Sequence, residues 1–372
     1  MEAVFCRILA MKPMLQGAYI YDNFITPETM PSFCRQHLSQ GNLPLWEQKI
    51  FSFILDFLDS SDSIIQQSSG TTGIPKKIKI PKKSMIRSAL LTAGKFDLQQ
   101  GQSALLCLPV DYIAGKMMIV RTLVTGMKLL WIEPSALPKG AADKKVDFCA
   151  MVPLQVFNLL EKGYPFTNIK TLIVGGSSLS AELEKRLQAL PCRIFETFGM
   201  AETCSHIALR RINGPYAKPW FSALPGVKIS TNNRNCLVIR APFLPKPVVT
   251  HDVAAITGIN KFLWKGRIDN IINSGGIKIN PESLEKMICD ILDHELYLVG
   301  IPDEKLGQKL VMVTSRHYSD EDKASALARL QHKLPVYHVP ADIITITAFP
   351  RNRSLKIDRK VLPGQVMKMK KN

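Results

Sequence analysis

The chain has 372 residues, and its composition, 46% hydrophobic and 21% charged, is that of an ordinary globular protein. A chain of this length is too long for one small core, so we expect a large domain and a smaller one. Its 48 lysines and arginines against 31 aspartates and glutamates give a net charge of +17. That charge favours nucleic acid, an anionic membrane, or small phosphorylated or carboxylated ligands as partners, although a generally basic surface is an equal alternative.

Simple patterns disfavour a zinc site, secretion and a membrane span. The eight cysteines are scattered, with no Cys-x-x-Cys pair and no cysteine–histidine cluster at zinc spacing, and most lie in apolar runs. Reduced thiols in a cytoplasmic protein are therefore expected. The first residues contain no basic leader or convincing cleavage site. The most apolar stretch, residues 117–132, is interrupted by Arg121 and Lys128 and is shorter than the roughly 20 residues that a spanning helix needs.

The first part of the chain alternates predicted helices and strands. Helices are predicted within residues 28–58 and over 82–96, 113–125, a segment ending at Gly163, and 179–190. Short apolar runs predict strands at residues 104–109, 127–133, 148–153, 171–176 and 192–199. This alternation predicts an α/β fold with mainly parallel sheets covered by helices, in which ligands bind beyond the strand ends.

The chain changes character near residue 222. Antiparallel strands are predicted at 226–242 and 261–267, then helices at 281–292 and 319–334 and strands at 295–302, 309–317 and 342–349. We therefore expect a large domain over residues 1–268 and a small, mobile α+β domain over residues 269–372. The basic tail, residues 367–372, is expected to be disordered.

The segment SSGTTGIPKK, residues 68–77, has the composition of an anion-binding loop. Its glycines let backbone N–H groups turn toward an anion, its hydroxyl groups add donors, and its lysines add positive charge. Only two residues separate Gly70 from Gly73, so the segment is not a Walker A loop. A plain polar surface loop is the alternative. The predicted polyphosphate ligands are Ser68, Ser69, Gly70, Thr71, Thr72, Gly73 and Lys76.

The same segment resembles the phosphate loop [ST]SG[ST]TGxPK of the adenylate-forming acyl- and aryl-CoA ligases. Further family motifs follow in order, and the resemblance spans residues 68–360, after an N-terminal region shorter than in many members. It implies ATP, Mg²⁺ and coenzyme A as cofactors and co-substrates, and a small carboxylic acid as the substrate. The acid is first joined to AMP with release of pyrophosphate, and is then transferred to the CoA thiol.

ETFGMAET, residues 196–203, resembles the family's YGMTET, and IVGGSS, residues 173–178, resembles its glycine-containing turn beside the adenine and acyl pocket. The resemblance makes Phe198 the platform for adenine and Glu202 a catalytic residue that holds Mg²⁺, an ion that takes only one or two carboxylates from a protein. Ala201 replaces the usual threonine. The nucleotide-binding residues implied here are Gly175, Gly176, Ser177, Thr197, Phe198, Gly199, Met200 and Ala201.

THDVA, residues 250–254, resembles the family's TGD, in which the aspartate accepts hydrogen bonds from the ribose. That role falls on Asp252, and His251 replaces the glycine. Taken alone, an aspartate here is more typical of an ordinary turn.

Residues 266–285 resemble GRxDDxIxxGGxxIxPxEIE, the most specific long match in the chain. The resemblance places Arg267 beside the ribose and phosphate, and makes Asp269 the hinge on which the small domain rotates. Ser274, Gly275 and Gly276 would approach the pantetheine arm of CoA. The sequence alone partly supports this contact with CoA, because a glycine pair between apolar runs indicates a close approach of the backbone.

PRNRSLKIDRK, residues 350–360, resembles the family's PRTxSGKIxR. The catalytic lysine of the family aligns with Lys356, and Arg359 aligns with the family's arginine, whereas Leu355 replaces a glycine. Composition alone would make Lys356 a surface residue. In the implied chemistry Lys356, Lys76 and the metal on Glu202 offset the repulsion between the carboxylate and the phosphates.

LPVDYIAGKMMIVR, residues 108–121, resembles LPxxHxxGxxxxxR of the aryl-CoA ligases. Tyr112 replaces the histidine, and Lys116 would pair with a second carboxylate of the substrate, unless it is a surface lysine. Within the family the chain looks most like the ligases that activate o-succinylbenzoate for menaquinone biosynthesis.

Several alternatives stay open. The chain could act on another aryl or acyl acid, or load a carrier protein. It could also be a nonenzymatic nucleotide- or RNA-binding protein, although its basic residues are dispersed and no aromatic–basic RNA motif occurs, so no nucleic acid partner is expected. The oligomeric state is undetermined, with a homodimer as one option.

Overall fold

The computed structural model describes residues 15–67, 77–141, 143–352 and 357–369. The chain forms two compact units, each assembled from separate stretches of sequence. The first contains residues 1–178, 187–229 and 239–248, and the second contains residues 179–186, 230–238 and 249–372. The boundary between a large domain, residues 1–268, and a small one, residues 269–372, stays a prediction.

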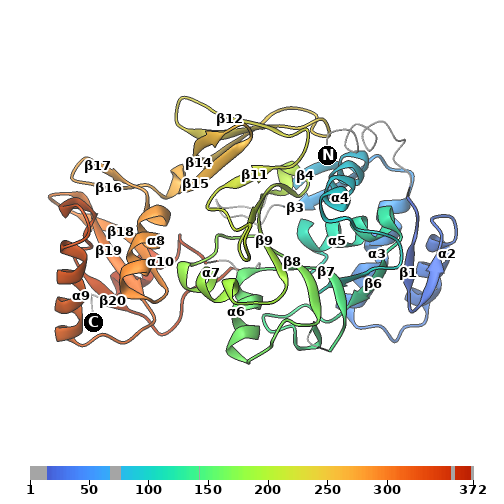
Figure 1. Cartoon of the computed structure of the whole chain (residues 1–372), viewed down its shortest axis with the longest axis horizontal. Helices are drawn as coiled ribbons and strands as arrows, with labels where there is room; N and C mark the ends of the chain where they lie inside the picture. The colour runs from blue at the N-terminus through green and yellow to red at the C-terminus, as the bar shows by residue number, and fades with distance from the viewer. Residues whose placement is uncertain (1–14, 68–76, 142, 353–356, 370–372) are drawn as a thin grey trace. The chain divides into compact units, whose positions relative to one another are not determined.

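The first unit is built on one large sheet (Figure 1). The central strands β6, β5, β7, β8 and β9 are neighbours in that order and run parallel. Strand β7 is buried along most of its length, as expected when helices cover both faces of a parallel sheet. The strands of the large sheet that lie wholly in this unit are β1 (Ala18–Ile20), β2 (Asn23–Ile25), β5 (Ser103–Leu106), β6 (Lys128–Trp131), β7 (Val146–Met151), β8 (Ile169–Val174), β9 (Arg193–Gly199), β10 (His206–Arg211) and β11 (Phe221–Ala223).

The first unit contains most of the helices that were predicted from apolar periodicity. The helices predicted over 82–96 and 113–125 are α4 (Lys82–Phe96) and α5 (Ile113–Thr125). Gly126 ends α5 with a φ of 68°, a left-handed conformation that suits glycine. The helical segment predicted within 28–58 is two helices, because Pro44 precedes the second one. The remaining helices are α2 (Met30–Ser39), α3 (Leu45–Leu58) and α6 (Pro153–Glu161).

A small hairpin that the sequence analysis missed precedes α4. Strands β3 (Ser63–Gln67) and β4 (Lys77–Pro81) pair antiparallel, and their last pair is Gln67 with Lys77. The predicted phosphate loop, residues 68–76, lies outside the described residues. The hairpin therefore brings both ends of that loop to neighbouring positions.

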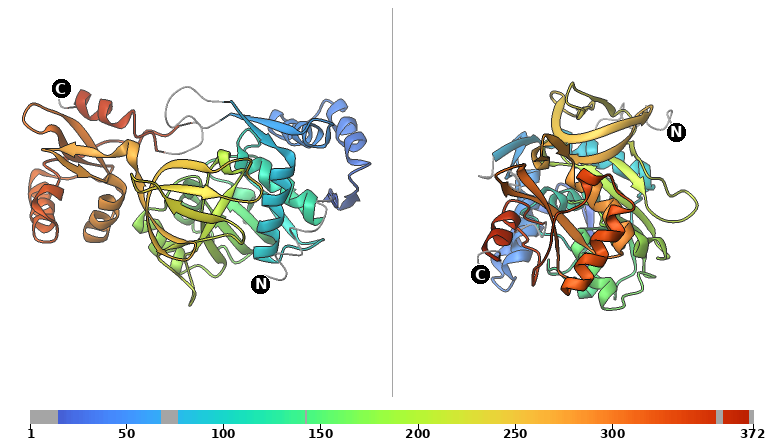
Figure 2. Two further views of the ribbon diagram at one scale, coloured as in Figure 1. Left: turned by 90° about the horizontal axis from the view of Figure 1, so that it is seen from above. Right: turned by 90° about the vertical axis from the view of Figure 1, so that its left-hand side faces the viewer.

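The second unit contains a β-ribbon and a three-layer α/β segment (Figure 2). In the layered part β17-β16-β19-β18 form one sheet, with β20 parallel to β19. The ribbon is formed by β14 (Val248–Gly258) and β15 (Lys261–Arg267). The elements of the layered part are β16 (Ile272–Ser274), β17 (Ile277–Ile279), α8 (Pro281–Leu292), β18 (Leu296–Asp303), β19 (Gly307–Thr314), α9 (Asp320–Gln331), β20 (Ile343–Thr345) and α10 (Leu362–Met369). Helix α7 (Ala181–Gln188) and strands β12 (Lys228–Thr231) and β13 (Cys236–Arg240) contribute residues to both units.

Alternation along β18 and β19 gives this sheet two apolar faces. Leu298 and Met312 pack with α8 and α9, whereas Val299 and Val313 pack with α10 on the other face. Residues 367–369, expected to be disordered, belong to α10, because Leu362 and Val366, one turn earlier, are fully buried against the sheet. The expectation of a disordered tail was therefore wrong for residues 367–369, and residues 370–372 lie outside the described part.

The described cysteines are free and buried, as the sequence predicts. Among the described residues no helix combines the length and apolar character needed to cross a membrane.

The core of the layered segment can be tested on one helix. Ile288 of α8 is fully buried, whereas its neighbour Met287 is 47% exposed. We expect Ile288→Ala to lower the free energy of unfolding by about 2–5 kcal/mol, because it leaves a cavity. Met287→Ala should change it by no more than about 0.5 kcal/mol. Urea denaturation followed by circular dichroism measures both, and equal losses would contradict this packing.

Candidate functional site

Three predicted binding segments converge at one edge of the parallel sheet in the first unit. Residues 107–112 follow β5, residues 175–178 follow β8, and residues 200–203 follow β9. Because these strands run parallel, their carboxyl ends meet at the same edge. Ligands of open α/β sheets bind at such an edge. The sheet therefore brings the predicted adenine, metal and acyl segments together.

Close backbone packing at this edge requires glycine at two predicted positions. A Cβ atom on Gly175 would lie 2.0 Å from Oγ1 of Thr197. One on Gly199 would lie 2.3 Å from the carbonyl oxygen of Ser205 and 2.4 Å from Cα of His206. Gly175 therefore allows the end of β8 to lie close to Thr197 of β9, and Gly199 allows the end of β9 to lie close to the start of β10.

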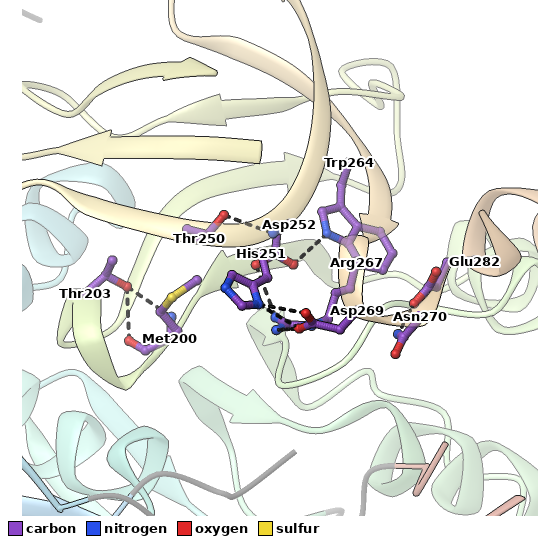
Figure 3. Close-up of polar contacts among 10 residues, drawn as sticks. All are labelled: Met200, Thr203, Thr250, His251, Asp252, Trp264, Arg267, Asp269, Asn270 and Glu282. Atoms are coloured by element: carbon purple, nitrogen blue, oxygen red, sulfur yellow. Dashed lines mark hydrogen bonds and ion pairs between the residues drawn. The ribbon is translucent and has the colours of Figure 1, made fainter. Parts of the chain in front are cut away.

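A tight turn after β9 presents Glu202. The turn Ala201–Thr203 is a 3₁₀ helix, in which Oγ1 of Thr203 accepts from the Met200 backbone N–H at 3.0 Å (Figure 3). The same hydroxyl group donates to the Ser205 carbonyl at 2.7 Å. Glu202 is exposed, and its carboxylate contacts none of the described residues through a hydrogen bond or ion pair.

The described residues contain no group of three histidine, cysteine or acidic side chains able to hold a metal ion by themselves. A single exposed carboxylate nevertheless suits Mg²⁺, which keeps waters and phosphate oxygens and takes few protein ligands. Glu202 therefore fits the predicted metal role in its chemistry.

A buried cation supports the same turn from α5. Arg121 is 2% exposed, and its Nη2 donates to Oγ of Ser205 at 2.6 Å and lies 3.4 Å from Nδ1 of His206. On its other side, His206 Nε2 lies 3.2 Å from Oγ1 of Thr92. Burial lowers the pKa of both Arg121 and His206 below their ordinary values. In the sequence Arg121 stands out only as a motif position and as an interruption of an apolar run, and neither pattern predicts this role.

The predicted acyl-pocket residues lie at the first turn of α5. Tyr112 is the N-cap residue and is half-buried. Lys116 follows one turn later, and its Nζ donates to Oε1 of Gln66 at 2.7 Å and lies 5.7 Å from the Phe53 ring centroid. Burial lowers the pKa of Lys116, against the opposing effect of nearby carboxylates. Lys116 is thus not a surface lysine, although its role toward a substrate stays a prediction.

Gln66 is a second residue that the sequence analysis missed. It is 1% exposed and lies on β3, immediately before the root of the predicted phosphate loop. Its Nε2 donates to the carbonyl oxygens of Gln67 and Asp111 at 2.8 and 2.9 Å. A glutamine in a short polar run does not predict these hydrogen bonds, which connect the start of the predicted phosphate loop to the predicted acyl segment.

In the second unit, Asp252 is held inside a polar network (Figure 3). It lies opposite Arg267 across the ribbon of β14 and β15. Its Oδ1 accepts from Nε1 of Trp264 at 2.9 Å, and its Oδ2 accepts from Nη1 of Arg267 at 3.4 Å. Burial raises the pKa of Asp252, although both donors oppose this. Asp252 lies within a strand, so the alternative of an ordinary turn residue was wrong.

The predicted hinge residue Asp269 is contacted by the histidine that departs from the family pattern. His251 Nδ1 donates to the Asp269 carboxylate at 2.8 Å, and Arg267 Nη2 donates to it at 2.8 Å (Figure 3). Burial raises the pKa of Asp269, but these hydrogen bonds outweigh burial and hold it below the ordinary value. Asp269 as the pivot stays a prediction.

The glycine pair Gly275–Gly276 forms the turn between β16 and β17. Their φ angles are 58° and 83°, and Ser274 pairs with Ile277, which defines a two-residue hairpin of the type that favours glycine at both positions. A Cβ atom on Gly276 would meet no atom within 4 Å, so the turn conformation, not crowding, demands glycine here. The predicted contact of Ser274, Gly275 and Gly276 with CoA is untested.

The predicted catalytic Lys356 lies, like Ser68–Lys76, outside the described residues. Arg359, three residues later in the chain, is described and forms an ion pair with Glu285.

Comparison with known proteins identifies the family. Residues 57–230 match the family described as AMP-binding enzyme. A solved structure from Dyadobacter fermentans, described as an AMP-forming acyl-CoA synthetase/AMP-acid ligase II-like protein, is 31% identical, with a TM-score of 0.58, over 88% of this chain and 97% of that one. The chain belongs to the AMP-binding enzymes.

Other members of the AMP-binding enzymes are similar over most of the chain. A 2-succinylbenzoate–CoA ligase of Lactococcus lactis is 26% identical over 341 residues, covering 84% of this chain and 73% of that protein. The o-succinylbenzoate CoA synthetase of Bacillus subtilis, solved with its acyl-adenylate intermediate, is 16% identical, with a TM-score of 0.72, over 96% of this chain. The latter establishes the shared fold.

The close approach at Gly199 can be tested directly. We expect Gly199→Ala to destabilise this AMP-binding enzyme by about 1–3 kcal/mol and to weaken ATP binding, because the new methyl group meets backbone atoms that cannot rotate away. Gly364→Ala in α10 is the control, since no atom lies within 4 Å of its Cβ position. Chemical denaturation and calorimetric ATP titration measure the two effects. A Gly199→Ala protein as stable as the control would contradict the packing at β9.

Burial of Asp252 predicts a pH dependence of stability. A carboxyl group whose pKa is raised by folding binds its proton more tightly in the folded state, so its contribution to stability is present at low pH and is lost as pH rises above the ordinary value of 3.8. Asp252→Asn removes this loss. We expect the free energy of unfolding of the variant, relative to the wild type, to increase as pH rises from about 4 toward neutrality. Denaturation at several pH values tests the sign, and a difference that is constant with pH would refute it.

Proposed function

We propose that the protein is an ATP-dependent acid–CoA ligase that activates o-succinylbenzoate for menaquinone biosynthesis in the cytoplasm. The observation that carries the proposal is the edge of the parallel sheet, where glycine-enforced packing presents Thr197–Glu202 beside Gly175–Ser177. Membership of the AMP-binding enzymes supports ATP as the nucleotide. Relatives named 2-succinylbenzoate–CoA ligases, from Lactococcus lactis and other bacteria, support the acid and CoA.

In the first step a carboxylate oxygen of the acid attacks the α-phosphorus of ATP. The bond from that phosphorus to the oxygen bridging the α- and β-phosphates breaks, and pyrophosphate leaves with the electron pair. Anions meet in this step, so nearby cations lower its barrier. We assign Lys76 and Lys356 to this role, and Glu202 to holding Mg²⁺. When bound, Mg²⁺ would neutralise phosphate charge and orient the leaving group.

We assign Phe198 to the adenine and Asp252 to the ribose of the nucleotide. Phe198 is half-buried on β9, with its ring centroid 5.8 Å from that of Phe221, so an adenine ring would meet an aromatic surface already braced on one side. Asp252 offers acceptor oxygens to the ribose hydroxyls, and Trp264 and Arg267 hold its carboxylate in place.

In the second step the CoA thiol loses its proton and its sulfur attacks the acyl carbonyl carbon. The bond from that carbon to the AMP oxygen breaks, which yields the thioester and AMP. Lys356 serves the first step and the turn at Ser274–Gly276 serves the second, so a rotation at Asp269 exchanges them.

Lys116 is the feature that favours a dicarboxylic aromatic acid. The acid would present one carboxylate for activation and a second one that requires a cation. Lys116 lies half-buried between Gln66 and the Phe53 ring, where a charge is poorly solvated and would gain from an anionic partner.

Pyrophosphate release tests the reaction and the substrate together. We expect release from ATP and Mg²⁺ to depend on o-succinylbenzoate in a panel of aryl and acyl acids, with CoA consumed in equal amount. Lys356→Ala should lower the adenylation rate at least about 100-fold, because the step loses a positive charge at the reacting phosphate. Lys360→Ala, which removes an exposed lysine four residues away, is the matched control and should retain activity.

Other results of this assay would change the proposed substrate, acceptor or function. Dependence on a different acid would keep the mechanism and replace the pathway. Transfer to a carrier protein but not to free CoA would indicate carrier loading. The absence of pyrophosphate release with every acid, together with salt-dependent RNA binding, would favour a nonenzymatic binding protein.

A further inference from the structure

Arg359 is clamped between two acidic side chains of α8. Its Nη1 and Nη2 donate to the two carboxylate oxygens of Glu285 at 2.8 and 2.5 Å, the paired geometry that a guanidinium forms with a carboxylate. Its Nε lies 3.9 Å from Oε1 of Glu282. The guanidinium also lies 5.3 Å from the ring centroid of Tyr297. Arg359 is therefore fixed on three sides.

The clamp is buried and charged. The side chains of Glu282 and Glu285 are 6% and 9% exposed, and that of Arg359 is 22% exposed. Burial opposes the charge on Arg359, but the Glu285 carboxylate outweighs it and raises the pKa of Arg359 above its ordinary value. Since a buried ion pair contributes little net stability, its fixed geometry is the more informative property.

The clamp is connected to the sheet and to the end of β15. Glu285 also accepts from the backbone N–H of Leu298 on β18 at 2.7 Å. Glu282 accepts a hydrogen bond from the side chain of Asn270, which directly follows the predicted hinge residue Asp269 (Figure 3). One oxygen of Glu282, Oε2, has no hydrogen-bond partner among the described residues.

Arg359 also sits at the base of a narrow chain reversal. Arg351 and Ile357 form an antiparallel bridge, and the Asp358 backbone N–H donates to the Pro350 carbonyl at 2.8 Å. Ile357 directly follows Lys356 in the chain. The clamp on Arg359 thus holds the arm of the reversal that leads out of the predicted catalytic lysine.

We propose that Arg359 is a positioning residue for adenylation: its ion pair with Glu285 fixes residues 357–359, which directly follow Lys356 in the chain. This rests on the proposed function, because it assigns Arg359 to the step that needs Lys356. In the proposed mechanism Lys356 serves adenylation, whereas thioester formation uses the turn at Ser274–Gly276. Loss of the ion pair should therefore slow adenylation and leave thioester formation unchanged.

The test compares Arg359→Lys and Glu285→Gln in the full chain. Lysine keeps the charge but cannot form the paired hydrogen bonds, and glutamine keeps the shape but removes the charge. We expect both variants to lower kcat for pyrophosphate release about 10- to 100-fold, with KM for ATP within about 2-fold of the wild type, because small misplacements of a reacting group carry losses of this size. Thioester formation from chemically prepared acyl-adenylate and CoA should stay within about 2-fold.

Arg351→Lys is the matched control. Arg351 lies on the other arm of the same reversal, is exposed, and is 4.0 Å from its acidic partner Glu295. Arg351→Lys should leave both half-reactions unchanged. Equal losses in both half-reactions of Arg359→Lys, with a lowered melting temperature, would show a purely structural role and overturn the proposal. Adenylation at the wild-type rate in both clamp variants would also overturn it.

A second readout does not depend on activity. In hydrogen exchange, the amides of residues 357–360 should lose protection in Glu285→Gln, whereas those of α9 should keep it. Unchanged protection at 357–360 in both clamp variants would overturn the proposal even if no acid is found. Failure of the wild type to release pyrophosphate would count against the proposed function alone.

Discussion

The constraint on which the site depends is the close packing at two glycines, at the carboxyl edge of the parallel sheet. Gly199 leaves no room for a side chain against Ser205 and His206, and Gly175 leaves none against Thr197. Gly199 meets main-chain atoms and Gly175 meets the Thr197 side chain, so the end of β8, the end of β9 and the turn carrying Glu202 pack closely together. The aromatic, acidic and glycine positions of the site follow from this one constraint.

Two arginines with little exposed surface restrain chain segments next to predicted catalytic residues. Arg121 braces the segment after Glu202 through Ser205, and Arg359 braces the chain after Lys356 through Glu285. Charges of this kind are expensive to desolvate and contribute little net stability. They do, however, fix side chains and neighbouring turns in one arrangement, which a reaction between two anions requires.

Much of the fold could be predicted because local signals agreed with the final structure. Helices 82–96 and 113–125 have clear periodicity, and the alternation with short apolar strands indicated the parallel sheet. The hairpin of β3 and β4 was missed because SIIQQ and KIKIP are short and partly polar. Helix α10 was missed because basic residues masked the apolar pair Leu362 and Val366. The clamp between Arg359 and Glu285 joins residues 74 positions apart, and no spacing rule reports such a pair.

His251 departs from the family pattern, and the structure shows what this side chain contacts. Where the family has glycine, His251 is half-exposed and donates to Asp269, so the position has room for a side chain and gives it a partner. The carboxylate of Asp269 then receives hydrogen bonds from two sides, from His251 and Arg267, which hold its pKa below the ordinary value. A glycine here would leave Arg267 as the donor. The substitution therefore adds, at the predicted pivot, a hydrogen bond that a glycine side chain could not form.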